Sequence, residues 1–231
     1  MEGFPVEVIG QILSHVGDVK DVLWASMTYP AVIAWLSHTS DSLRHLTYKV
    51  PISTEHVNML ERCGRMRCLK SLTLRYADIR FRANPTAQQF LRLLSLIVSA
   101  VKVSELQVQS LVSACPKLQS FSLTDSTITS TNPRGTLNLT SSTLKAFFLG
   151  GIRLHSVILE ANFLKKLGLA WCDFTNFKLV TKGACKLSSL SLKTVDIDHL
   201  DLGSHTHCLG LKKVEVKEPC SYVWTVVDSI L

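Results

Sequence analysis

One hydrophobic pattern occurs eight times along the chain between Leu43 and Val216. Each copy has an apolar residue, two variable residues, a second apolar residue, one variable residue and a third apolar residue. Successive copies start 20 to 27 residues apart, and this near-constant spacing predicts a repeat protein. The copies start at Leu43, Leu69, Leu91, Leu118, Leu144, Leu164, Leu187 and Leu211.

Each copy ends in an apolar, a variable and a second apolar residue, and this alternation is typical of a short strand. The two apolar residues of the strand, which are the second and third of the copy, lie on the core side. The period lies in the range of leucine-rich repeats, about 20–29 residues. We therefore expect an α/β leucine-rich-repeat solenoid of parallel strands, with strands near 71–74, 120–123, 146–149, 166–169 and 189–192. The positions expected to face outward include Thr73, Arg75, Ser122, Thr124, Phe148, Gly168, Ala170, Ser191, Lys193, Glu215 and Lys217.

The segments that return from one strand to the next carry weaker signals. Leu106 to Ala114 has helical spacing, which places Leu111 and Val112 inward. Elsewhere we expect irregular returns, because Thr, Ser, Gly and Asn are frequent between residues 124 and 143.

The N-terminal segment differs from the repeats. Phe4-Pro5 opens a stretch of apolar residues at helical spacing that ends at Gly17. Asp18 is a suitable cap for a second helix through Ala25, and a third apolar stretch runs from Pro30 to Leu36. We therefore divide the chain into a helical module, residues 1–36, and a repeat domain, residues 37–231. The module is too small to stand alone, so it must pack on the repeats or bind another protein.

Composition narrows the class of protein further. The chain has 231 residues, 46% of them hydrophobic, and we expect neither a secretory signal nor a membrane-spanning helix in it. Its seven cysteines are irregularly spaced, which favours free thiols in a reducing compartment, the cytoplasm or nucleus. Cys115 precedes Pro116 at the start of a strand, where a small buried residue fits.

The net charge of +7 is concentrated around the second repeat. One interpretation of this cluster is a solvated basic face, and the other is a docking surface for an acidic partner. Few aromatic residues alternate with the basic ones, so we expect no nucleic acid partner. The cluster contains Arg62, Arg65, Arg67, Lys70, Arg75, Arg80 and Arg82.

Motifs for chemistry are missing from the sequence. It contains no Gly-rich phosphate loop, no nucleophile elbow and no His-Glu-x-x-His helix. His205-Thr206-His207-Cys208 is too closely spaced for a closed metal site and predicts a surface turn. We therefore expect a non-enzymatic protein without metal or cofactor. An enzyme that uses the basic second repeat on a phosphorylated ligand is the weakest alternative.

The chain as a whole resembles the F-box/LRR proteins, particularly those of plants. Phe4-Pro5-Val6-Glu7-Val8-Ile9-Gly10-Gln11-Ile12-Leu13-Ser14 resembles the opening of an F-box, where Leu-Pro is more usual, and Asp21 to Ser26 resembles its second helix. Ser113 to Leu123 is similar to the Ala-Cys-Pro strand signature of F-box-associated repeats. After Thr28 the sequence departs from the F-box pattern, as if a segment had been skipped, and the repeat array ends at Leu231 without a polar capping repeat.

The resemblance implies a substrate-recognition subunit of an SCF-type ubiquitin ligase. The F-box would bind a Skp-type adaptor, and through it a cullin, while the repeats hold a protein substrate; no nucleic acid or membrane is involved. The alternative is a leucine-rich-repeat interaction scaffold whose shortened F-box no longer binds the adaptor. The adaptor contacts carried over from the family are Phe4, Pro5, Val8, Ile9, Ile12, Leu13 and Val16.

Overall fold

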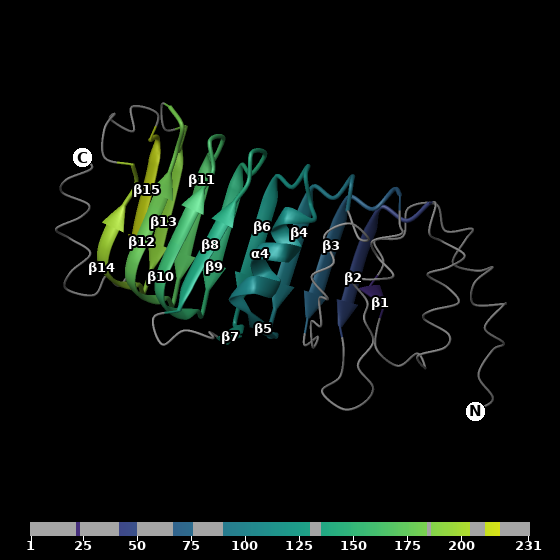
Figure 1. Ribbon diagram of the computed structural model, residues 1–231, viewed down its shortest axis with the longest axis horizontal. Coiled ribbons are helices and arrows are strands. Elements are labelled where there is room, and N and C mark those ends of the chain that lie inside the picture. The colour runs from purple at the N-terminus through teal and green to yellow at the C-terminus, as the bar shows by residue number, and fades with distance from the viewer. Residues whose placement is uncertain are drawn as a thin grey trace.

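The computed structural model of the chain describes residues 22–23, 42–49, 67–75, 90–129, 135–183, 186–203 and 211–217. In these ranges the chain winds into an elongated stack of coils (Figure 1). Each coil adds one parallel strand to a nine-stranded main sheet, in the order β1-β2-β3-β4-β6-β9-β11-β13-β15. The strands are β1 (Val22–Leu23), β2 (His45–Lys49), β3 (Ser71–Arg75), β4 (Ser95–Ser99), β6 (Ser120–Thr124), β9 (Ala146–Gly150), β11 (Lys166–Ala170), β13 (Ser189–Lys193) and β15 (Lys213–Lys217).

The predicted solenoid of parallel strands is therefore confirmed. Equivalent residues of successive repeats lie side by side, as Leu167 beside Leu190 illustrates. The predicted inward residues are buried: Leu72, Leu74, Phe121, Leu123, Leu167, Leu169, Leu190 and Leu192. Arg75 and Lys217 are exposed and Lys193 is half-buried, so none of the three belongs to the core.

The register expected for the third repeat is wrong by two residues. Leu91, expected to open the repeat, is 58% exposed, whereas Leu93 is fully buried. In β4, Leu96 lies beside Leu72 of β3 and Val98 beside Leu74. The stretch from Leu91 to Val98 fits the pattern in two registers, and only the observed one turns all three apolar positions inward. In the observed register the third repeat starts 24 residues after the second and 25 before the fourth, whereas the expected register gave 22 and 27.

The predicted irregular returns are also wrong in the second half of the chain. There the returns form a second parallel sheet, in the order β14-β12-β10-β8. Its signal was the alternation of apolar residues, such as Leu137 with Leu139 and Val157 with Leu159, all of which are buried. The Thr, Ser and Asn residues between them occupy more exposed positions of the strands. The strands are β8 (Thr136–Thr140), β10 (Arg153–Glu160), β12 (Asp173–Val180) and β14 (Asp196–Asp201).

The return that follows β4 is helical, as predicted. A short strand, β5 (Lys102–Ser104), pairs with β7 (Thr127–Thr129) and leads into α4 (Glu105–Ser113). Ser104 caps this helix: its hydroxyl accepts from the Gln107 backbone N–H, and the Gln107 side chain accepts from the Ser104 N–H. Leu111 and Val112 are buried, as expected.

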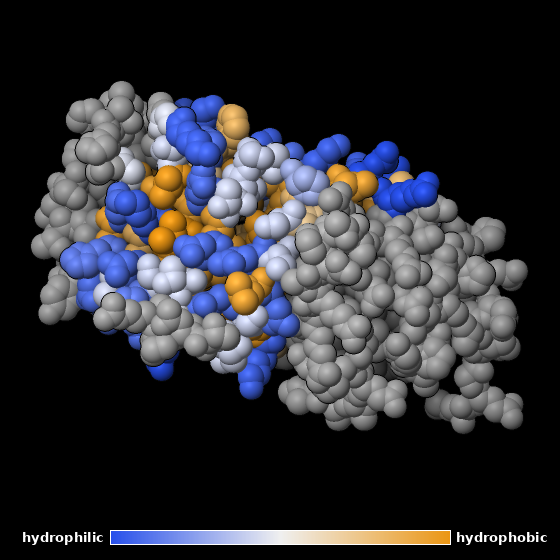
Figure 2. All heavy atoms as spheres, in the orientation of Figure 1, coloured by the Kyte–Doolittle hydropathy of each residue, from blue (hydrophilic) through white to orange (hydrophobic). Residues whose placement is uncertain are grey.

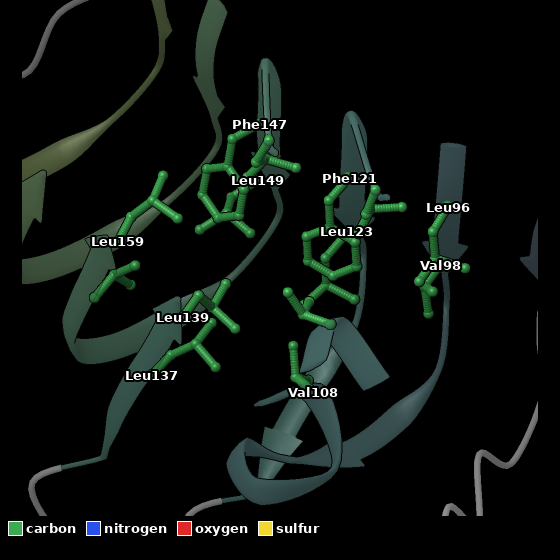
Figure 3. Packing of buried hydrophobic residues seen from close by; sticks show 14 of the residues in the cluster. Leu96, Val98, Val108, Phe121, Leu123, Leu137, Leu139, Phe147, Leu149 and Leu159 are labelled. Atoms are coloured by element: carbon green, nitrogen blue, oxygen red, sulfur yellow. The ribbon is translucent and has the colours of Figure 1, made fainter. Parts of the chain in front are cut away.

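The core lies between the main sheet and the returns. In Figure 3, Leu96, Phe121 and Phe147 and their neighbours point from the main sheet toward Leu137, Leu139 and Leu159 of the second sheet and Val108 of α4. The rings of Phe121 and Phe147 stack with their centroids 6.0 Å apart. A continuous apolar layer of this kind ties each coil to its two neighbours.

Part of the N-terminal helical module is contradicted by the structure. Val22 and Leu23, expected in a helix that starts at Asp18, form the short strand β1, which pairs with Thr47 and Tyr48 of β2. The edge of β2 offers unpaired backbone groups that a parallel strand can satisfy, and this pairing competes with a helix. The other residues of the predicted module lie outside the described ranges.

Candidate functional site

The predicted adaptor contacts cannot be placed on this fold. Phe4, Pro5, Val8, Ile9, Ile12, Leu13 and Val16 all lie outside the described residues. The boundary between a module at 1–36 and a repeat domain at 37–231 likewise stays a prediction. The described coils do define surfaces on the repeat domain itself: two rims and an outer face.

The two rims are the edges of the main sheet where its strands start and end. In Figure 1 the main-sheet strands run downward and the second-sheet strands run upward, so the strand starts form the upper rim and the strand ends form the lower rim. The strand-end rim is called the corner rim here, after the five residues that turn the chain there: Ala100, Asp125, Gly151, Trp171 and Thr194.

Each of these five corner residues adopts a left-handed backbone conformation, with φ between 48° and 63°. Four of the five are not glycine, although this region is costly for residues with a Cβ. A hydrogen bond compensates at every corner, because the corner N–H donates to the last residue of the next main-sheet strand. The N–H of Asp125 reaches the Gly150 carbonyl at 2.7 Å, and that of Trp171 reaches the Lys193 carbonyl at 2.8 Å.

The strand-start rim carries a row of cations at one repeat position, directly after the first leucine of the repeat. Five of the eight repeats have Lys or Arg there, and all five residues are exposed. Their backbone is fixed, because the carbonyl at this position accepts two N–H groups of the next coil. The Lys145 carbonyl, for example, accepts from Lys165 at 2.8 Å and from Lys166 at 3.0 Å. The five residues are Arg44, Lys70, Lys145, Lys165 and Lys212.

Seven more exposed cations flank this row, in the turns and at the first strand residues: Arg67, Arg92, Lys117, Lys166, Lys182, Lys186 and Lys213. Together these twelve residues form what is called the basic rim here. The upper edge of the molecule in Figure 2 is accordingly rich in hydrophilic residues. Three acidic residues of the described chain lie at or just below this rim, and each faces a lysine: Glu160 Oε1 is 2.8 Å from Lys182 Nζ, Asp201 Oδ2 is 3.4 Å from Lys178 Nζ, and Glu215 Oε2 is 3.2 Å from Lys213 Nζ.

The basic cluster predicted around the second repeat is divided by the fold. Of its seven residues, the structure describes Arg67, Lys70 and Arg75. Arg67 and Lys70 belong to the basic rim, whereas Arg75 ends β3 at the opposite rim. A five-residue strand spans about 16 Å, so these residues do not form one compact patch.

The outer face of the main sheet carries mostly small polar residues, with one large aromatic side chain. Phe148 of β9 is 37% exposed, and its ring covers the neighbouring strand at Gly168. A Cβ on Gly168 would lie 2.6 Å from the Phe148 ring, so any other residue there would have to displace the ring. Gly168 and Ala170 were expected at the surface; both are buried, and Phe148 is the cover over Gly168.

A second exposed aromatic residue stands at the adjacent end of β11. Trp171 is 56% exposed even though it occupies a left-handed corner with φ of 51°. The Lys193 ammonium lies 4.3 Å from the centroid of its ring, in a cation–π contact. A large apolar side chain held open in a strained conformation is a reason to suspect function, because stability alone would place it inward.

Metal-binding groups do not cluster in the part of the chain that the structure describes. No group of three His, Cys, Asp or Glu residues there could hold a metal ion. Burial raises the pKa of the Cys115 thiol to about 12, and it also raises the pKa of Cys172. Cys115 is therefore a protonated core residue, as predicted. No helix within the described residues is long and apolar enough to span a membrane. His205 to Cys208 lie outside those residues.

Comparison with known proteins identifies the family of these coils. Residues 34–223 match the family model "FBD-associated F-box protein At5g56370, LRR repeats". The chain belongs to the F-box/LRR-repeat family. It is also 39% identical, over 263 residues, to the F-box/LRR-repeat protein At1g67190 of Arabidopsis thaliana. That match covers 87% of this chain and 62% of the relative, so the chain spans less than two thirds of the relative's length. No solved structure matches the chain.

Two features of this F-box/LRR-repeat chain escaped the sequence analysis. Trp171 follows the third apolar residue of its repeat by two positions, in a place that pattern reading assigns to a loop. The basic rim could have been found from sequence, because five repeats share a cation directly after the first leucine. The grouping by sequence proximity around the second repeat concealed this periodic signal.

Proposed function

We propose that this chain acts as a substrate-recognition subunit of an SCF-type ubiquitin ligase, in which the N-terminal segment binds a Skp-type adaptor and the coils hold a protein substrate. The observation that carries the proposal is the outer face of the main sheet in a chain of the F-box/LRR-repeat family: Phe148 is exposed on this face in the described coils, and Trp171 is exposed at the adjacent end of β11. Aromatic residues are enriched among the side chains that dominate protein–protein binding energy.

The proposed role requires no reacting group in the chain itself. A receptor that holds its substrate beside the loaded ubiquitin-transfer enzyme raises the effective concentration of the substrate lysine at that enzyme. Rigid coils suit this task, because they fix where the substrate lies relative to the adaptor. Their solenoid core supplies the rigidity independently of the N-terminal segment.

The experiment is co-precipitation of the full chain with a Skp-type adaptor and with its other partners from cells treated with a proteasome inhibitor. Ile12→Asp with Leu13→Asp should abolish adaptor recovery, because burying unpaired carboxylates in the contact costs several kcal/mol. Phe148→Ala with Trp171→Ala is the matched control, since it should keep the adaptor and lose the substrate. Adaptor recovery that is unchanged in the first variant would contradict the assigned contacts.

The alternative, a repeat scaffold with a non-functional F-box, is supported by one observation. Val22 and Leu23 pair with β2, although they lie in the stretch that resembles the second F-box helix. If the wild-type chain recovers repeat partners but no adaptor, this alternative replaces the ligase role.

A further inference from the structure

We propose that the basic rim binds an extended acidic segment of a protein partner, laid across successive coils at the strand starts. The inference deepens the proposed function, and rests on it in so far as that partner is the ligase substrate. The rim is assembled by the solenoid, because its residues come from repeats that are distant in sequence. Arg44 and Lys212 stand at the two ends of the row.

Most cations of the rim have no carboxylate partner among the described residues. Among the twelve, only Lys182 and Lys213 pair with a carboxylate of the described chain, Glu160 and Glu215 respectively. Lys145 donates to the Gln119 side chain at 3.1 Å, which leaves its charge uncompensated. Neighbouring strands lie about 4.8 Å apart, so Lys145 and Lys165 place like charges on adjacent coils. An anion bound along the rim would relieve this repulsion.

The dimensions of the rim fit an extended peptide. Seven strand-to-strand steps separate β2 from β15, which gives a row about 34 Å long. A peptide that rises about 3.3 Å per residue would cover the row with about ten residues. It would cross the main-sheet strands rather than join them, because the backbone groups at the strand starts already bond to one another. Recognition would therefore run through side-chain charge.

The surroundings of the rim favour an acidic peptide over a single-stranded nucleic acid. Nucleic acid of that kind needs aromatic faces on which bases can stack. The described rim has one exposed aromatic residue, Phe163, which is 46% exposed, and the Lys186 ammonium lies 4.3 Å from the centroid of its ring. Exposed Leu91, by contrast, offers an apolar anchor of the kind that a peptide side chain can use.

The test measures binding of a fluorescein-labelled peptide of about twelve glutamates, long enough to span the row, to the full chain by fluorescence anisotropy. The rim variant carries Lys145→Gln, Lys165→Gln, Lys166→Gln and Lys212→Gln. The matched control carries Arg75→Gln, Lys102→Gln, Arg153→Gln and Lys217→Gln, which removes the same charge from the opposite rim. A third variant with Lys→Arg at the four rim positions retains the charge. Thermal unfolding confirms that each variant is folded.

We expect the rim variant to lose at least about tenfold in affinity, because four exposed charge contacts are removed together. The control should lose less than about twofold, the Lys→Arg variant should bind like wild type, and added salt should weaken binding as it screens the charges. Equal losses in the two neutralised variants, or no binding by the wild-type chain, would overturn the proposal. Tighter binding of an oligodeoxythymidylate of equal length, lost in the rim variant, would reassign the rim to nucleic acid.

Co-precipitation of the adaptor by the same rim variant separates this inference from the proposed function. Adaptor binding should be unchanged, because the rim residues belong to the coils and not to the N-terminal segment. If the rim variant keeps adaptor binding and binds the peptide as tightly as the wild-type chain, the acidic partner alone is rejected. If the wild-type chain recovers no adaptor but binds the peptide through the rim, the ligase role alone is rejected.

Discussion

The basic rim and the corner rim are two edges of the same sheet, and they are built by different means. The corner rim is constrained in its backbone: the five coils of β4, β6, β9, β11 and β13 each place one left-handed residue there and tie it to the next strand. Its charges are mixed, with Asp125, Asp173 and Asp196 among the cations, and Arg153 lies 3.9 Å from Asp173. In the described coils the basic rim has no such repeated corner, since positive φ occurs there at two glycines, Gly183 and Gly203, and its charged residues are mostly cations.

This difference separates what the fold requires from what it merely permits. A side chain on the corner rim must tolerate a left-handed backbone, so its identity is restricted by geometry. The backbone of the basic rim accepts Leu94, Gln119 and Ser188 at the position that elsewhere holds a cation. The fold therefore does not need charge there, and the cations call for an explanation outside the stability of the coil.

The largest expected effect comes from the core between the rims. Leu190→Ala should lower the free energy of unfolding by about 2–5 kcal/mol, because a buried side chain is replaced by a cavity. Lys165→Ala on the basic rim should change it by less than about 0.5 kcal/mol. Urea unfolding of both variants measures the difference. A comparable loss in Lys165→Ala would mean that the basic rim is structural, and would remove the contrast between the rims.

A smaller loss is expected at the corner rim. Gly151→Val should destabilise by about 1–3 kcal/mol, because a β-branched residue is forced to positive φ. Its Cβ would also lie 2.8 Å from Asp125 Oδ1. The control is Ala100→Gly at the same corner of an earlier coil, which relieves the left-handed strain and should be neutral or stabilising by up to about 1 kcal/mol. Thermal unfolding separates the two, and a harmless Gly151→Val would refute the constraint.

The capping box at the start of α4, in the return that follows the Ala100 corner, gives a test at a level of about 1 kcal/mol. Ser104→Ala should cost about 0.5–2 kcal/mol, since the capping box that closes the helix start is lost. Ser113→Ala, in the last turn of the same helix, should have little effect or stabilise slightly, because alanine is the better helix former. Chemical denaturation with circular dichroism detects both changes. Equal losses of stability in Ser104→Ala and Ser113→Ala would indicate that the capping box does not stabilise the helix.

The sequence predicted the main sheet from β2 to β15, because the signal is repeated in each of these coils, whereas β1 lies outside the repeats and was expected to be helical. The fixed spacing of the leucines determines the position of a strand such as β11. The single wrong register, at Leu91, occurs where the repeat pattern can be aligned in two ways. The returns were less predictable. α4 has helical spacing over nine residues, whereas the second sheet rests on short alternations such as Leu137 and Leu139. These were hidden among polar residues that suggested loops.

The candidate surfaces were harder to predict, because they depend on which residues the coils bring together. Phe148 was expected to face outward, but the burial of Gly168 beneath it depends on a ring leaning across a neighbouring strand. Trp171 lies in a corner whose left-handed backbone has no sequence signature when the residue is not glycine. Such contacts are set by the pairing of strands far apart in sequence, and a repeat alignment gives the pairing only after the register is known.

The smallest expected effect concerns the contact between Trp171 and Lys193 at the corner rim. A double-mutant cycle of Trp171→Ala and Lys193→Gln should give a coupling of about 0.5–1 kcal/mol, the usual strength of an exposed cation–π pair. Urea unfolding of the four proteins provides the cycle. A coupling of this size leaves the ring open to a partner, because replacing Lys193 by a partner group would cost little. A coupling well above that range would identify the pair as structural, and Trp171 would then no longer qualify as a binding residue.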